Sequence, residues 1–130
     1  MNQSGQIATR VGTFRIGDIV LVALGSDIDD ATVMEMENSL TEEISRKNTT
    51  GVIIDTSQLD IVDTFTGRML GALTKMSRIL DARTIVVGMR PAVAITLVEL
   101  GMPLVDLETA LNVDRGMEKL RYSGPGGGFG

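Results

Sequence analysis

The sequence predicts a small α/β domain in which helices pack on a mixed, mostly parallel sheet. Two runs, residues 51–55, which end in Asp55, and residues 84–88, are otherwise almost wholly apolar and rich in β-branched residues, which is typical of strands covered on both faces. Each run lies between segments with helical spacing, and an expected hairpin precedes them. A chain of 130 residues has the size of one domain.

Residues 7–24 are expected to form the opening hairpin. Residues 7–14 alternate between apolar and polar side chains, which indicates an edge strand. After a turn at Gly17 and Asp18, the run 19–24 is apolar throughout and predicts a strand that is covered on both faces.

The first helix is expected between Gly25 and the polar segment 48–51. Carboxylates suited to an N-cap stand at its start, and Arg46 and Lys47 stand at its end, so the charges complement the helix dipole at both ends. Apolar residues recur with helical spacing at Val33, Met36, Leu40 and Ile44.

A second helix is expected to begin at Asp63 or Thr64, with Asp63 as its N-cap. It follows the buried strand 51–55, which ends in the carboxylate of Asp55, and the loop 56–63. Its helical period is carried by the apolar residues Phe65, Met69, Ala72, Leu73, Met76, Ile79 and Leu80.

A third helix is expected over residues 91–100, with Pro91 at its first position and Gly101 past its end. It is apolar almost all round, so either it belongs to the core or its outer face meets another subunit. For the second alternative, Val93 and Leu97 are the candidates for an outward-facing partner interface.

The end of the chain is expected to contain a last short strand over residues 104–107 and a closing helix capped by Asn112 or Asp114. Residues 123–130 contain five Gly and one Pro, which predicts a flexible tail. The expected division is a domain over residues 1–122 followed by this tail.

The composition excludes several classes of function. The chain has no Cys and no His, which removes disulfides, thiolate catalysis, an imidazole general base and the usual structural zinc sites. Its net charge is −5 and its only aromatic residues are three Phe and one Tyr, so we expect it to bind neither nucleic acid nor an anionic membrane. No apolar run could span a bilayer and the N-terminus is unlike a secretory signal, so a cytoplasmic location is expected.

Three carboxylates, those of Asp55, Asp60 and Asp63, gather between the central strand and the second helix, where open α/β sheets usually bind ligands. Their irregular spacing matches no metal-coordinating loop, and each has an ordinary structural role as a strand end, loop residue or helix cap. The glycine-rich tail follows no strand and precedes no helix, unlike a phosphate-binding loop. We therefore expect no metal and no cofactor.

The hydroxyl of Thr64 lies at the expected start of the second helix, directly after Asp63. A phosphoryl group there would meet the positive end of the helix dipole and three nearby acids. Such a modification is expected to change the charge of this edge more than the fold.

Two stretches of the chain resemble a known family. GVIID at residues 51–55, followed by LDIVDTF at residues 59–65 and by Gly71, resembles the signature of STAS domains, the anti-sigma-factor antagonist family. GMRPAVAITLVELG at residues 88–101 is similar to the stressosome branch of that family. Because no sensory domain precedes these motifs, the chain resembles the small scaffold subunit of that branch more than its larger, sensor-bearing paralogues.

The resemblance implies a sheet of four to five strands with helices mainly on one face. It also implies a non-enzymatic role: in this family a switch serine/threonine kinase phosphorylates the hydroxyl residue directly after the Asp at the second helix start, and the unphosphorylated protein retains that kinase. The matching residue is Thr64, where most small scaffold subunits have Ser, and Ser57 in the same loop is the second candidate. The implied partners are the kinase, a sensor-bearing STAS paralogue and further copies of the chain in a large assembly.

Two other functions remain open at this point. One is a binding module for a nucleotide, a lipid or another small ligand, as in other STAS-containing proteins. The other is a small metal-dependent enzyme.

Overall fold

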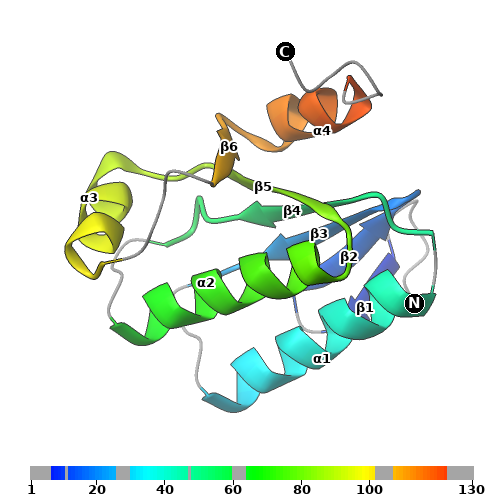
Figure 1. Cartoon of the computed structure of the whole chain (residues 1–130), viewed down its shortest axis with the longest axis horizontal. Helices are drawn as coiled ribbons and strands as arrows, with labels where there is room; N and C mark the ends of the chain where they lie inside the picture. Colours follow the sequence, from blue (N-terminus) through cyan, green and yellow to red (C-terminus); the bar gives the residue numbers. More distant parts are fainter. Residues whose placement is uncertain are drawn as a thin grey trace.

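The structure is a computed structural model that describes residues 7–10, 12–25, 30–46, 48–59, 64–101 and 107–122. In chain order its elements are β1 (Ile7–Arg10), β2 (Thr13–Ile16), β3 (Ile19–Ala23), α1 (Asp30–Arg46), β4 (Gly51–Asp55), α2 (Thr64–Ile79), β5 (Arg83–Val87), α3 (Pro91–Glu99), β6 (Glu108–Ala110) and α4 (Val113–Arg121). Figure 1 shows α1 and α2 side by side along one side of the sheet and α4 on the other side.

The strands of the described residues form one sheet in which they lie in chain order, from β1 to β6. The pairs β1–β2 and β2–β3 are antiparallel, whereas β3, β4, β5 and β6 pair in parallel. Leu21, Ile53 and Ile85 lie side by side across the three central strands. The predicted α/β fold with a mixed, mostly parallel sheet is confirmed.

The described residues contain six strands instead of four or five, because the first expected strand is divided into β1 and β2. The chain turns at Gly12, whose φ of 63° is a left-handed conformation that glycine adopts without steric penalty. Gly12 O accepts a hydrogen bond of 2.8 Å from Ala23 N, and an added Cβ would lie 2.8 Å from the Ala23 oxygen. At the other edge the strand is Glu108–Ala110, and residues 102–106 lie outside the described residues.

The two faces of the sheet have separate cores. Alternate residues of β4 point to opposite faces, with Val52 and Ile54 in one core and Ile53 in the other. The larger core lies under α1, α2 and α3 and includes Val20, Val22, Met36, Leu40, Leu70, Leu73, Val86, Val93 and Leu97. The smaller core, under α4, contains Ile19, Ile53, Ile85 and Val87. Because both faces are covered, the central strands have no polar face, and the helices lie mainly on one side as expected.

Helix α3 corrects one prediction of the sequence analysis. Val93 and Leu97 are buried, with 1% and 0% of their surface exposed, so the expectation that they face outward is wrong. Their spacing of one helical turn places both on the side that meets the larger core. Ile95 and Val98 instead face outward, at 60% and 61% exposed. In a short helix that is apolar almost all round, hydropathy alone does not distinguish the two sides.

The helix limits agree well with the sequence. Helix α2 begins at Thr64, one of the two expected positions. Asn112 is the N-cap of α4, and its side-chain oxygen accepts a hydrogen bond of 3.0 Å from Arg115 N. Gly101, directly after α3 and its C-cap residue, has a φ of 84°, as a helix-ending glycine commonly does.

Candidate functional site

The candidate site lies at the edge of the sheet where the parallel strands β4 and β5 end. Asp55 is the last residue of β4, and its Oδ1 accepts a hydrogen bond of 2.9 Å from Ser57 N, which closes a turn directly after the strand. Thr56 is fully buried and donates to Val87 O from both its backbone nitrogen, at 2.9 Å, and its hydroxyl, at 3.0 Å. These bonds fix the direction in which the chain leaves β4 toward α2.

Gly88 allows the chain after β5 to pass close to this turn. Its φ is 71°, and an added Cβ would lie 2.9 Å from Ser57 Cβ and 3.3 Å from Asp55 Oδ1. Leu59, whose nitrogen donates to Thr56 O at 3.0 Å, is 1% exposed and packs in the larger core. The turn is therefore held from both sides, by β5 and by the core.

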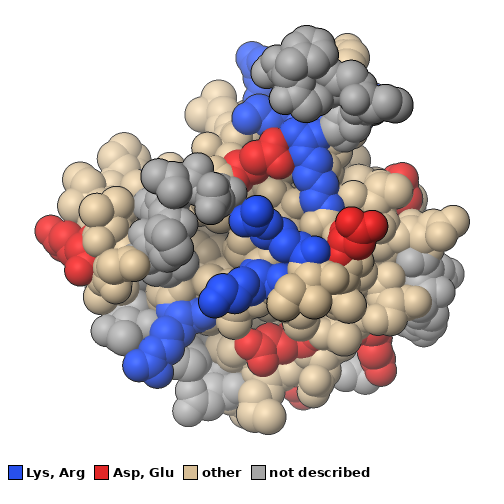
Figure 2. All heavy atoms as spheres, viewed as in Figure 1, with Lys and Arg blue, Asp and Glu red and all other residues tan. Residues whose placement is uncertain are grey.

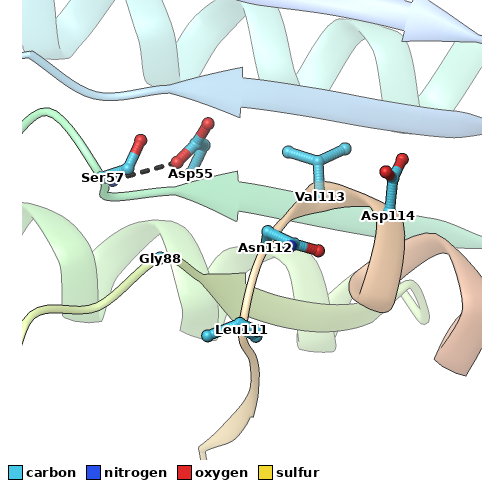
Figure 3. A pocket seen from close by; sticks show the side chains of 7 residues that line it. All are labelled: Asp55, Ser57, Gly88, Leu111, Asn112, Val113 and Asp114. Carbon is cyan, nitrogen blue, oxygen red and sulfur yellow. Dashed lines mark hydrogen bonds between the residues drawn. The ribbon is translucent and has the colours of Figure 1, made fainter.

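A pocket of about 290 Å³ opens at this edge (Figure 3). Asp55, Ser57 and Gly88 line it from the strand ends, and Leu111, Asn112, Val113 and Asp114 line it from the start of α4. The polar lining consists of two carboxylates, an amide and a hydroxyl, with no cationic side chain. A phosphate group would meet negative charge here, so the lining does not favour a nucleotide.

The structure brings together only part of the site that the sequence predicts. Asp55 and Ser57 lie in one turn, where Ser57 is half-buried. Thr64 is the first residue of α2, and its side chain lies outside the part that the structure describes, as do Asp60 and Asp63. The acidic edge therefore consists, among the described residues, of Asp55 together with Asp114.

Asp114 and Asn112 belong to this edge, although the sequence analysis assigned them only a capping role. They reach it because β6 pairs in parallel with β5, so the end of β6 and the start of α4 lie at the edge where β4 also ends. The signal in the sequence was the short strand before a capping residue, because a parallel strand carries its following loop to the same edge.

An ion pair between β5 and β6 also contacts α4. Arg83 binds Glu108 through two hydrogen bonds, of which the one from Nε to Oε1 measures 2.8 Å, and Arg83 Nη1 also donates to Lys119 O at 3.2 Å. These hydrogen bonds lower the pKa of Glu108 below its ordinary value and raise the pKa of Arg83. Lys119 Nζ donates to Thr109 O at 2.8 Å, so α4 is also tied directly to β6.

The described residues contain no group of three or more His, Cys, Asp or Glu side chains that could hold a metal ion. Within the same ranges, no helix combines the length and apolarity needed to cross a membrane.

The fold and the sequence together define a class. Residues 13–115 match the STAS-domain family, and the chain belongs to this family. Among solved structures, the chain is similar to a serine-to-glutamate variant of RsbS from Moorella thermoacetica, with 33% identity over 85% of this chain and 96% of that chain and a TM-score of 0.79.

Two further structures extend the comparison. A chain of the stressosome, which is described as a signal integration and transduction hub, shares 33% identity over 84% of this chain and 95% of that chain, with a TM-score of 0.78. The anti-sigma factor antagonist SpoIIAA in its unphosphorylated form covers 80% of this chain at 14% identity and a TM-score of 0.60, which shows the shared fold. Among curated protein sequences, none matches the chain.

Proposed function

We propose that this chain is a non-enzymatic scaffold and antagonist in a stressosome-type signalling complex, controlled by phosphorylation of Thr64. The observation that carries the proposal is its similarity, at 33% identity and over 95% or more of the other chains, to RsbS and to a chain of the stressosome. The partners we propose are a switch serine/threonine kinase, a sensor-bearing STAS paralogue and further copies of the chain. The expected cytoplasmic location stays a prediction.

Thr64 is favoured over Ser57 by the way Ser57 is bound. Ser57 N donates to Asp55 Oδ1 at 2.9 Å, and Ser57 O accepts from Arg90 Nη2 at 3.3 Å. A kinase that draws its substrate segment into an active site would have to break this turn. Thr64 stands instead at a helix start, where the local charge of the helix favours a phosphate.

The proposed switch is electrostatic. A phosphate adds about −1.5 to −2 charges at neutral pH, on an edge that already carries Asp55 and Asp114. The helix dipole stabilises an anion at the first turn by about 0.3 to 1 kcal/mol, which favours retention of the helix. The fold persists, and a kinase surface matched to the neutral hydroxyl is repelled.

The first test is phosphopeptide mapping after incubation of the full chain with the cognate switch kinase and ATP. One phosphate per chain on Thr64 is expected, none on the Thr64→Ala variant, and full incorporation in the Ser57→Ala control. The Thr64→Ser variant restores the hydroxyl and is expected to be modified as well. Modification confined to Ser57 or to residues 123–130 would contradict the proposal.

The second test is kinase capture. The Thr64→Ala variant is expected to bind the kinase as tightly as the unmodified chain, whereas the phosphorylated chain binds about tenfold or more weakly. Backbone NMR shifts measured on both states are expected to change near the start of α2 and the β4 turn. Shifts spread across the whole sheet, or equal affinity in both states, would show that local repulsion is not the mechanism.

A further inference from the structure

The solvent-facing sides of α1 and α2 carry opposite charges. Helix α2 contains Arg68, Lys75 and Arg78, all exposed, and no acidic residue. Helix α1 exposes Glu35 and Glu42. A third acidic residue of α1, Glu43, does not belong to this surface, because it is buried in an ion pair with Arg15. Figure 2 shows the basic side chains following α2 across the molecule, with acidic ones beside them over α1.

Four of these five charged side chains, those of Arg68, Lys75, Glu35 and Glu42, have no side-chain hydrogen bond or ion pair within the part of the chain that the structure describes. Arg78 differs, because its charge helps to lower the pKa of Glu108. In a chain with a net charge of −5, an exposed helix face with cations only is a local exception. A basic surface on α2 beside an acidic surface on α1 is suited to binding a partner that carries the opposite charges in the same arrangement.

The spacing of the exposed residues is also that of a helix-packing surface. Among the exposed residues, Ala31, Glu35, Asn38, Glu42 and Ser45 form one row along α1, and Arg68, Ala72, Lys75 and Ile79 form one row along α2, with Met34 and Arg78 exposed beside them. Both sets alternate steps of four and three, which produces one straight stripe along each helix. The small residues leave room for a second helix, and Met34 and Ile79, exposed at 63% and 79%, add apolar surface to each stripe.

The two helices form one continuous face. Each connects a pair of neighbouring parallel strands, so α1 and α2 run in the same direction along the sheet. They are in contact through Thr41 Oγ1, which donates to Met76 Sδ at 2.8 Å. Glu35 and Arg68 both lie in the second turn of their helices, and Glu42 and Lys75 both lie in the fourth.

We propose that this α1–α2 face binds the same face of a second copy of the chain. The two-fold axis runs parallel to the helices, so that α1 of each copy lies on α2 of the other. A two-fold axis across the helices would instead place α1 on α1 and α2 on α2, with like charges opposed. Charge complementarity therefore selects one of the two geometries. The inference rests on the self-association included in the proposed function and assigns it a surface.

The size of the face predicts a weak contact. Two helices of this length present about 500 Å² per partner, against about 800 Å² in a stable complex of standard size. The pair is therefore expected to form at low ionic strength and to dissociate at high salt, because the Debye length falls from about 30 Å at 0.01 M to about 3 Å at 1 M. Inside a larger assembly, several weak contacts of this kind act together.

A charge swap tests the inference by sedimentation of the full chain at low salt. One variant, Lys75→Glu with Arg78→Glu, makes the face mainly acidic, and the other, Glu35→Lys with Glu42→Lys, makes it wholly basic. Each alone is expected to self-associate at least tenfold more weakly than the unmodified chain, while an equimolar mixture associates at least as tightly as the unmodified chain. The control, Arg115→Glu with Arg121→Glu on α4, has the same charge change as the α2 variant but on the other side of the sheet, and it is expected to self-associate normally.

Failure of the swap can be separated from failure of the proposed function. Kinase capture is measured on the same variants, because Lys75 and Arg78 lie more than two turns from Thr64. If the variants capture the kinase but the mixture does not recover association, the α1–α2 face is the wrong surface and the proposed function is untouched. If the α2 variant no longer captures the kinase but still self-associates, this face binds the kinase and the inference is overturned. A chain that is monomeric at every salt concentration overturns both the inference and the proposed self-association.

Discussion

The two faces of the sheet differ in how they are covered. One face supplies most of the stability of the domain, and the other positions residues of the candidate site. Three helices cover one face and bury a large, continuous core that includes Leu40, Leu73 and Leu97. On the other face a single helix, α4, covers a small core, and its closest approach depends on Gly116. The first face sets the stability of the domain, whereas the second places the N-terminus of α4 over the edge where β4 ends.

The largest effect is expected when a charge is placed in the larger core. Leu97→Asp puts a carboxylate at a fully buried position of α3 and is expected to destabilise the domain by at least about 3 kcal/mol. Val98→Asp, at the neighbouring exposed position, is expected to cost about 0.5 kcal/mol. Urea denaturation followed by circular dichroism measures both. Equal losses would mean that α3 does not face the core as described.

A truncation in each core compares the two faces directly. Leu73→Ala removes a fully buried side chain from the larger core and is expected to cost about 2 to 5 kcal/mol. Leu120→Ala removes a half-buried side chain of α4 and is expected to cost about 1 kcal/mol, in proportion to the smaller apolar area removed. Thermal and urea denaturation should place the two variants in this order. A reversed order would show that the larger core does not contribute more to stability than the smaller one.

The contact of α4 with the sheet is tested at Gly116. An added Cβ would lie 2.9 Å from Val87 Cγ1 and 3.3 Å from Ile53 Cδ1, both side chains of the smaller core. Gly116→Ala gains about 1 kcal/mol of helix propensity but loses about 1 to 3 kcal/mol to overpacking, so a net loss of about 1 kcal/mol is expected. The matched control is Gly25→Ala, where nothing lies within 4 Å and stability should change by less than about 0.5 kcal/mol. A more stable Gly116→Ala variant would show that α4 sits farther from the sheet.

The smallest effect concerns the ion pair beside α4. Because the pKa of Glu108 is lower in the folded state, its contribution is present above about pH 4.5, its ordinary value, and is lost as the pH falls through the lowered pKa. Both partners are partly exposed, so solvent screening limits the contribution to at most about 1 kcal/mol. Glu108→Gln should therefore lower stability at pH 7, and its difference from the unmodified chain should vanish in acid. The control is Glu99→Gln at the exposed end of α3, a carboxylate that forms no ion pair among the described residues, and it should change stability at pH 7 by less than about 0.5 kcal/mol.

Much of the fold follows from local signals in the sequence. The apolar run 51–55, the start of α2 at Thr64, the helix punctuated by Pro91 and the cap at Asn112 are all confirmed, because each depends on neighbouring residues alone. The turn at Gly12 was missed because it interrupts a run whose apolar alternation continues on both sides.

The rest of the site could not be predicted because it depends on which elements become neighbours. Asp55 and Asp114 line one pocket only because β6 pairs with β5; the sequence indicates a short strand before Asn112 but not which strand lies beside it. The direction in which Val93 and Leu97 point depends on where α3 docks, and a helix with two apolar sides leaves that open. The charge difference between α1 and α2 is visible in the sequence, but it becomes a surface only once the two helices lie side by side.

The order of the strands in the sheet has a consequence for how the chain folds. Because the strands lie in chain order, each newly synthesised strand joins the edge of the sheet that already exists, and none has to insert between two earlier ones. Every parallel pairing closes a loop of one helical crossover, so the entropic cost of each step is similar and modest. The domain can therefore grow from its N-terminal hairpin outward while the ribosome is still translating it, with α4 the last element to dock.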